Sequence, residues 1–139
     1  MKISIGADHR GFQLKSEIIK HFSGYSWLDV GTNSSERIDY PIPARDLCHN
    51  IIEKKSELGI LICGSGIGVT IAANRFKRIY AGLCWNEDVA RVAKQDDGIN
   101  VLVLPADFLS SQQAFSIITT WLTTEFKGGV YQQRLHMID

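Results

Sequence analysis

The clearest chemical signal in this chain is a cysteine at the end of an apolar run, followed by three glycines in five residues. The run covers residues 58–63 and is typical of a buried strand, and Gly64-Ser65-Gly66-Ile67-Gly68 follow Cys63. A glycine-rich turn at a helix start presents backbone N–H groups that can hold an oxyanion or a phosphate. A thiol beside such a loop is what proton transfer on a phosphorylated small molecule requires.

Structural roles for the same residues stay open. Glycines admit the positive φ angles of a tight turn, and a buried cysteine is commonly inert. Two known nucleotide motifs are excluded. No lysine and hydroxyl pair follows the last glycine, as a Walker loop needs, and Val69 stands where a dinucleotide fingerprint would have its third glycine.

A second group of polar residues follows the first predicted strand. Residues 1–7 alternate in the manner of a strand, and Asp8, His9 and Arg10 come before an amphipathic helix. Ligands of open α/β sheets bind outside the carboxyl ends of strands, where the strand order reverses. We therefore expect these residues near Cys63, with His9 placed to donate to a phosphate. Asp8 is also a common helix cap, and that role stays open.

Apolar segments alternate with helical patterns along the whole chain. Strands are expected at residues 1–7, 26–30, 58–63, 80–85 and 100–104. Helices are expected from residue 12, from 41 to about 55, over 67–74, after Asn86, after Ser110 or Ser111, and over 130–137. This alternation predicts an α/β domain over residues 1–139, with a five-stranded parallel sheet, helices on both faces and an extra C-terminal helix.

Composition excludes several classes of protein. The 15 Lys and Arg residues balance 15 Asp and Glu residues, so no nucleic-acid partner is expected. No apolar run approaches the roughly 18 residues of a membrane helix, and residues 1–7 do not read as a signal peptide, so we expect a cytoplasmic protein without a membrane partner. Three cysteines at irregular spacing indicate neither disulfides nor a metal site, and Cys48 and Cys84 are expected to be buried.

Taken together, these motifs resemble type B ribose-5-phosphate isomerase, a family that also contains the bacterial galactose-6-phosphate isomerase subunits. The similar segments are collinear over nearly the whole chain: residues 6–12, 34–41, 62–68, 71–75, 100–102, 128–129 and 133–134. The resemblance implies a Rossmann-like three-layer α/β/α domain and no metal or organic cofactor. It also implies a homodimer or a dimer of dimers, with the sites at the subunit interface.

The same resemblance implies roles for individual residues. Cys63 matches the base that moves a proton between carbons 1 and 2 of an open-chain sugar through a cis-enediolate. Ser65 stands where the family usually has threonine and keeps the hydroxyl that assists the thiol. The amides from Gly64 to Gly68 match the loop that stabilises the enediolate oxygen. The other implied contacts to the sugar and its phosphate come from Asp8, His9, Tyr40 and Arg134, although Arg134 also reads as an ordinary surface residue.

The chain departs from the family's pattern at four further positions. Asp96 and Asp97 replace a His-Asn pair whose histidine opens the furanose ring. Either the Asp96 carboxylate accepts the anomeric proton in its place, or the enzyme relies on the free aldehyde fraction of its substrate, and Asp97 is expected to contact the substrate. Asp107 and Val130 stand where the family tends to have phosphate-binding arginines. An aspartate at position 107 is expected to repel a phosphate dianion.

The sequence therefore predicts an aldose–ketose isomerase that interconverts ribose 5-phosphate and ribulose 5-phosphate in the non-oxidative pentose phosphate pathway. One alternative keeps the chemistry and changes the substrate to a six-carbon sugar phosphate, such as allose or galactose 6-phosphate. A second alternative is a non-catalytic subunit that binds a sugar phosphate.

Overall fold

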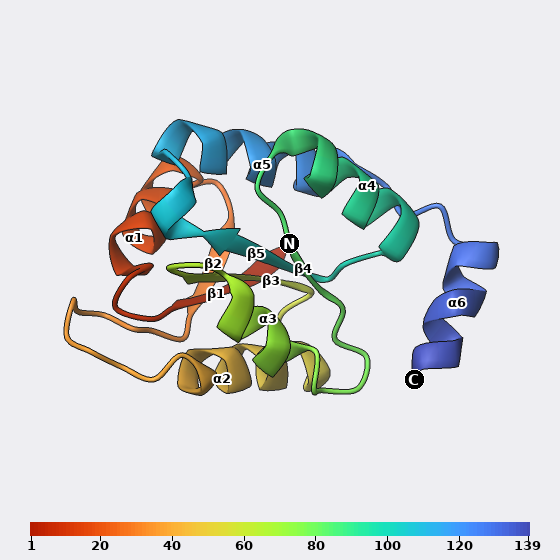
Figure 1. Ribbon diagram of the computed structural model, residues 1–139, viewed down its shortest axis with the longest axis horizontal. Helices are drawn as coiled ribbons and strands as arrows, with labels where there is room; N and C mark the ends of the chain where they lie inside the picture. The colour runs from red at the N-terminus through yellow and green to blue at the C-terminus, as the bar shows by residue number, and fades with distance from the viewer.

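Five parallel strands lie side by side at the centre of the structure, in the order β2-β1-β3-β5-β4 (Figure 1). The structure is a computed structural model of residues 1–139. The strands are β1 (Lys2–Ala7), β2 (Ser26–Asp29), β3 (Leu58–Cys63), β4 (Ala81–Leu83) and β5 (Val101–Pro105). The predicted five-stranded parallel sheet is confirmed. β4 is shorter than predicted, because only Ala81 to Leu83 pair with β5 and the Tyr80 amide donates to Asn100 Oδ1 instead.

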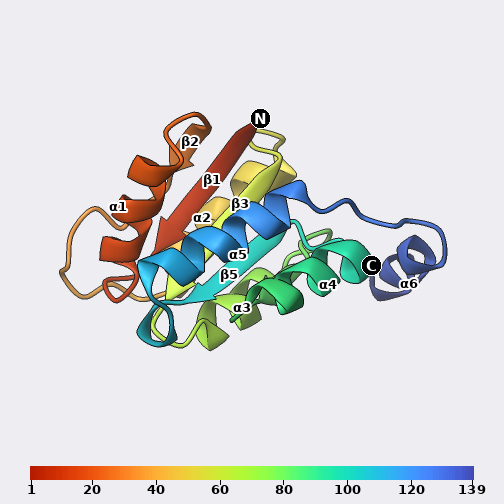
Figure 2. The ribbon, with the colours of Figure 1, turned by 90° about the horizontal axis from the view of Figure 1, so that it is seen from above.

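Helices cover both faces of the sheet, which confirms the predicted three-layer arrangement (Figure 2). One face carries α1 (Phe12–His21), α4 (Glu87–Asp97) and α5 (Ser111–Thr123), and the other carries α2 (Pro41–Ile52) and α3 (Ile67–Ala73). A short 3-10 turn, η1 (Ala106–Phe108), follows β5.

Local sequence explains where these helices begin and end. Asn86 caps α4 as predicted, and Ser110 rather than Ser111 caps α5, since its Oγ accepts from the Gln113 amide. α2 ends three residues before the predicted residue 55, because Lys54 has φ 60, a left-handed conformation that no α-helix continues.

The alternation of side chains along β3 decides which way the cysteine faces. Ile60 and Ile62 belong to the core beneath α1 and α5, whereas Leu61 and Cys63 belong to the core beneath α2 and α3. The chain leaves β1 for β2 and then returns past β1 to β3, so the strand order reverses between β1 and β3. Asp8, directly after β1, and Cys63, the last residue of β3, therefore lie at the ends of the two strands that flank the reversal.

A buried lysine fastens α1 to the edge strand β2. Lys15 is 1% exposed, and its Nζ lies 2.6 and 2.8 Å from the two carboxylate oxygens of Asp29. The same ammonium donates to Asn33 Oδ1 at 3.3 Å. The Asp29 side chain is 34% exposed, so the pair is only partly buried, and losing Asp29 would leave a buried ammonium group without its counter-ion.

The last helix, α6 (Val130–Ile138), stands apart from the layers at the end of an extended segment (Figures 1 and 2). Leu135 is its one buried residue, whereas Met137 is 85% exposed. None of the helices is long and apolar enough to cross a membrane.

Candidate active site

Cys63 differs from the other two cysteines in its surroundings. Its sulfur lies at the carboxyl end of β3, is 5% exposed and accepts a hydrogen bond from the Gly66 amide at 3.1 Å. Cys48 and Cys84 are fully buried, and burial raises the pKa of each thiol to about 12. Both were predicted to be buried hydrophobic residues, and this is confirmed. A donor aimed at sulfur supports the negative charge of a thiolate, so Cys63 is the cysteine equipped to act as a base.

The glycine turn after Cys63 needs glycine at its centre. Gly66 has φ 76, and a Cβ added there would lie 2.4 Å from Leu83 Cδ1 and 3.2 Å from Val103 Cγ1. The left-handed backbone, which glycine adopts without a Cβ clash, directs the Gly66 amide at the sulfur. Ser65 is half-buried, and its Oγ accepts from the Ile67 amide at 3.2 Å. The turn therefore places a backbone donor at the thiol, and the Ser65 hydroxyl lies within the same turn.

Two residues of the site come from neighbouring loops. The Tyr40 ring lies against Gly68, where an added Cβ would be 2.8 Å from Cζ of the ring. His9 Nδ1 accepts from the Ile38 amide at 3.3 Å, so the neutral ring carries its proton on Nε2. The loop at residues 30–40 thus packs against both strand ends, and His9 keeps one N–H to donate to a ligand.

Asp8 is buried to 6% exposure beneath this surface. Its Oδ1 accepts from the amides of Arg10 and Gly11 at 2.9 and 3.1 Å. Asp8 does not cap α1, because the N-cap of that helix is Gly11 and it has no side-chain cap; Asp8 instead holds the turn at residues 8–11 that precedes the helix. Because both amides donate to Oδ1, the other carboxylate oxygen of Asp8 is available to a sugar hydroxyl.

One contact at this edge of the sheet was missed from the sequence. The Arg10 guanidinium forms an ion pair with Asp107, and the amide of Asp107 donates to the Gly64 carbonyl at 3.0 Å. Arg10 follows β1, Gly64 follows β3 and Asp107 follows β5, three strands that are neighbours in the sheet. The positive charge of Arg10 therefore offsets the negative charge of Asp107, which was expected to repel a phosphate. The sequence does show a positive residue after β1 and a negative residue after β5. Only the strand order, however, shows that these two residues are close enough to pair.

Three predicted site residues lie far from Cys63 within one chain. Asp96 and Asp97 end α4, immediately before β5 begins, and Arg134 lies on α6. They are therefore at the edge of the sheet where strands begin, whereas Cys63 is at the edge where strands end. Asp96 Oδ1 pairs with Lys127 Nζ at 2.8 Å, and this carboxylate raises the pKa of Lys127. The exposed Arg134 guanidinium lies 5.3 Å from the Tyr131 ring centre.

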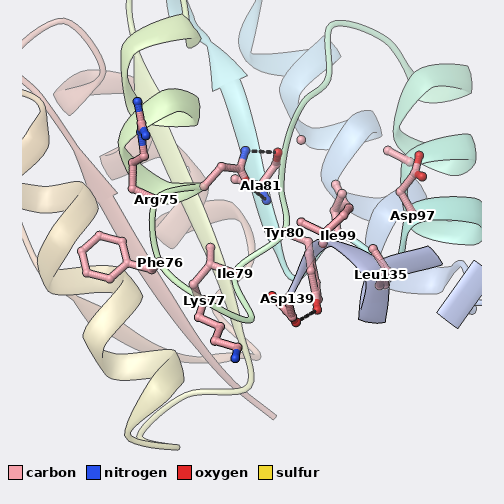
Figure 3. Close-up of a pocket in the computed structure, with 14 residues that line it drawn as sticks. Arg75, Phe76, Lys77, Ile79, Tyr80, Ala81, Asp97, Ile99, Leu135 and Asp139 are labelled. Atoms are coloured by element: carbon pink, nitrogen blue, oxygen red, sulfur yellow. Dashed lines mark hydrogen bonds between the residues drawn. The ribbon is translucent and has the colours of Figure 1, made fainter. Parts of the chain in front are cut away.

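A cavity lies at this second edge (Figure 3). It has a volume of about 670 Å³ and lies between β4, α4, α6 and the segment 74–80 that follows α3, with Arg75, Lys77 and Asp97 in its lining. Tyr80 Oη donates to Asp139 Oδ2 at its border, as the figure shows. Burial, with this hydrogen bond second, raises the pKa of Tyr80 to about 12, and the same bond lowers the pKa of Asp139.

Comparison with known proteins places the chain in a family. A family model described as Ribose/Galactose Isomerase matches residues 3–138. The chain belongs to the ribose/galactose isomerase family. This confirms the resemblance seen in the sequence, and with it the prediction of an enzyme, an aldose–ketose isomerase of sugar phosphates.

Individual members of the family are similar over almost their whole length. Ribose-5-phosphate isomerase B of Escherichia coli is 40% identical, over 99% of this chain and 93% of that protein. The structure of a ribose 5-phosphate isomerase from Thermotoga maritima has a TM-score of 0.97 at 40% identity, over 99% of this chain and 97% of that one. Ribose-5-phosphate isomerase B from Mycoplasma genitalium, solved with bound ribulose-5-phosphate, has a TM-score of 0.94 at 35% identity, over 99% and 93% of the two chains.

Proposed function

We propose that this protein interconverts ribose 5-phosphate and ribulose 5-phosphate, with Cys63 as the base. The observation that carries the proposal is the sulfur at the reversal of strand order, with the Gly66 amide donating to it at 3.1 Å. The choice of a five-carbon sugar rests on the similar proteins from Escherichia coli and Thermotoga maritima, which are named for ribose 5-phosphate.

The proposed chemistry needs one carbon-bound proton to move. The Cys63 thiolate takes the proton from carbon 2 of the aldose, and the electron pair of that bond forms the carbon–carbon double bond of an enediolate. The carbonyl oxygen at carbon 1 becomes negative, and the loop amides after Cys63 stabilise it, a contribution of about 3–4 kcal/mol for each well-aimed donor. The thiol then returns its proton to carbon 1, while the hydroxyl proton on oxygen 2 passes to oxygen 1, so atoms and charge balance.

The residues around the sulfur orient the sugar. The unengaged carboxylate oxygen of Asp8 accepts from a sugar hydroxyl, and Nε2 of His9 donates to the substrate. Tyr40 is 40% exposed, and its ring lies over Gly68 beside the Cys63 loop. Binding at these points holds the reacting carbons at the sulfur, so binding energy is used for orientation.

The site is completed by a second copy of the chain in this proposal. Arg134 and Asp96 cannot reach the Cys63 of their own chain, because they lie at the opposite edge of the sheet. Ile67 and Ile71 on α3 are 57% and 56% exposed next to the Cys63 loop, and they offer an apolar surface for that second copy. We therefore infer a homodimer, or a dimer of dimers, in which Arg134 binds phosphate and Asp96 assists ring opening in the partner's site.

Turnover by the pure protein tests the chemistry. We expect conversion of ribose 5-phosphate to ribulose 5-phosphate by the natural chain and none by Cys63→Ala. Cys48→Ala is the matched control and keeps full activity, because this thiol is fully buried. Equal activity of Cys63→Ala and the natural chain would refute Cys63 as the base, and no turnover by the natural chain would refute the substrate.

Mixing two inactive variants tests the shared site. Cys63→Ala and Arg134→Ala are each expected to be nearly inactive alone. After unfolding and refolding together, hybrid dimers contain one site with both residues intact, so about a quarter of the natural activity returns. No recovery in dimers shown to be hybrid would mean that Arg134 serves the Cys63 of its own chain or none.

A six-carbon sugar phosphate remains the second candidate, because the family description includes galactose. Comparing kcat/KM for ribose, allose and galactose phosphates decides between them. A higher value for either six-carbon substrate would replace the ribose assignment and leave the roles of Cys63 and Gly66 intact.

A further inference from the structure

An arginine lies flat against the residue that follows the base. A Cβ built on Gly64 would lie 2.1 Å from Arg10 Cζ and 2.3 Å from Arg10 Nε. The guanidinium therefore occupies the space that any other residue at position 64 would fill. On its far side it pairs with Asp107, so it spans the ends of β1, β3 and β5.

The ion pair between Arg10 and Asp107 contributes little to the stability of the fold. The Arg10 and Asp107 side chains are 53% and 38% exposed, and ion pairs at such positions contribute about 0–1 kcal/mol. The pair is also placed directly above a catalytic loop. Arg10 has five N–H groups, and the recorded ion pair engages its Nη2, which leaves donors for an anion.

We propose that Arg10 binds the phosphate of the substrate and that Asp107 is a positioning residue that holds it across Gly64. This inference rests on the proposed function of the Cys63 site. The sulfur is 5% exposed and the guanidinium is half exposed, so Arg10 lies at the rim while the reacting carbons lie deeper. The phosphate of a sugar phosphate is at the end of the molecule away from carbons 1 and 2, and it therefore remains at the rim. A planar guanidinium fits two phosphate oxygens at once.

The ion pair gives this proposal a distinctive signature. Arg10→Ala removes the attraction for phosphate and also leaves the Asp107 carboxylate unpaired beside a dianion. The double variant Arg10→Ala with Asp107→Ala removes that repulsion as well. The double variant should therefore bind phosphate better than Arg10→Ala alone, which loss of folding or of loop structure would not produce.

Binding of ribitol 5-phosphate and ribitol tests the proposal without turnover. Neither has a carbonyl group, and they differ only in the phosphate. Calorimetry should show Arg10→Ala binding ribitol 5-phosphate about 10- to 100-fold more weakly, the usual value of a hydrogen bond to a charged group. The double variant should bind ribitol 5-phosphate at least about threefold more tightly than Arg10→Ala does. The affinity of Arg10→Lys should lie between those of the natural chain and Arg10→Ala.

Controls separate this inference from the proposed function. Arg91→Ala removes a 47% exposed arginine paired with Asp88 on α4 and should leave both affinities unchanged. Loss of ribitol 5-phosphate affinity in Arg10→Ala supports the inference even if ribose 5-phosphate proves not to be the substrate. The inference fails if Arg10→Ala binds ribitol 5-phosphate within twofold of the natural chain. It also fails if the double variant binds no better than Arg10→Ala, or if ribitol affinity falls equally.

Discussion

Gly66→Ala should damage stability and catalysis together, for two separable reasons. The residue has φ 76, and a non-glycine residue there costs about 1–2 kcal/mol. The new Cβ would also lie 2.4 Å from Leu83 Cδ1 and 3.2 Å from Val103 Cγ1, and overpacking of this kind costs about 1–3 kcal/mol. The expected loss in the free energy of unfolding is therefore about 2–5 kcal/mol.

Urea unfolding measures the first effect. The midpoint should fall by about 1–2 M, since a small domain has a slope of about 1–3 kcal/mol per molar urea. Gly128→Ala is the control for the backbone term alone, because Gly128 has φ 67 and nothing lies within 4 Å of its added Cβ. Equal destabilisation by the two variants would refute the packing term.

Steady-state kinetics measures the second effect. Relief of the Leu83 contact moves the amide that donates to Cys63 Sγ, so kcat should fall about tenfold or more while the variant is still folded. An unchanged kcat in folded Gly66→Ala would refute the role assigned to this amide.

Two further predictions concern the thiols and the last helix. At pH 8, iodoacetamide should leave Cys48 and Cys84 unmodified in the folded protein, because burial raises the pKa of both to about 12, and mass spectrometry of digested protein checks this. The Asp139 pKa is lowered below its ordinary 3.8, so its contribution to docking α6 is present above that pH and is lost as pH falls through the lower, folded value. Hydrogen exchange in α6 should increase in that acid range, and Tyr80→Phe should reduce this pH dependence; unchanged dependence would contradict the contact.

The fold was predictable because its signals are local. Residues 58–63 and 100–104 are continuous apolar runs, as strands covered on both faces require, and Asn86 marks a helix start. The proximity of Asp8 to the Cys63 loop followed from a general property of parallel sheets, whose carboxyl ends share one edge.

The contacts that complete the candidate site depend on strand order, which the sequence pattern does not contain. Arg10 meets Asp107 only because β3 lies between β1 and β5 and ends in a glycine. Tyr40 meets Gly68 through a long loop with no regular pattern of its own. The remote position of Asp96, in contrast, had a signal in the sequence, since a helix residue just before a strand must lie where that strand begins.

Lys15 has a consequence for how the sheet assembles. β2 is a short edge strand with half-exposed side chains, and its register on β1 is held both by Trp27, which packs against the core, and by Asp29, which pairs with Lys15. A shift by one residue would turn the Asp29 carboxylate to the other face and strand an ammonium group in the interior without its counter-ion. The buried charge of Lys15 thus reinforces one alignment of the edge strand, and that alignment sets where the loop at residues 30–40 begins, the loop whose Ile38 contacts His9 and whose last residue is Tyr40.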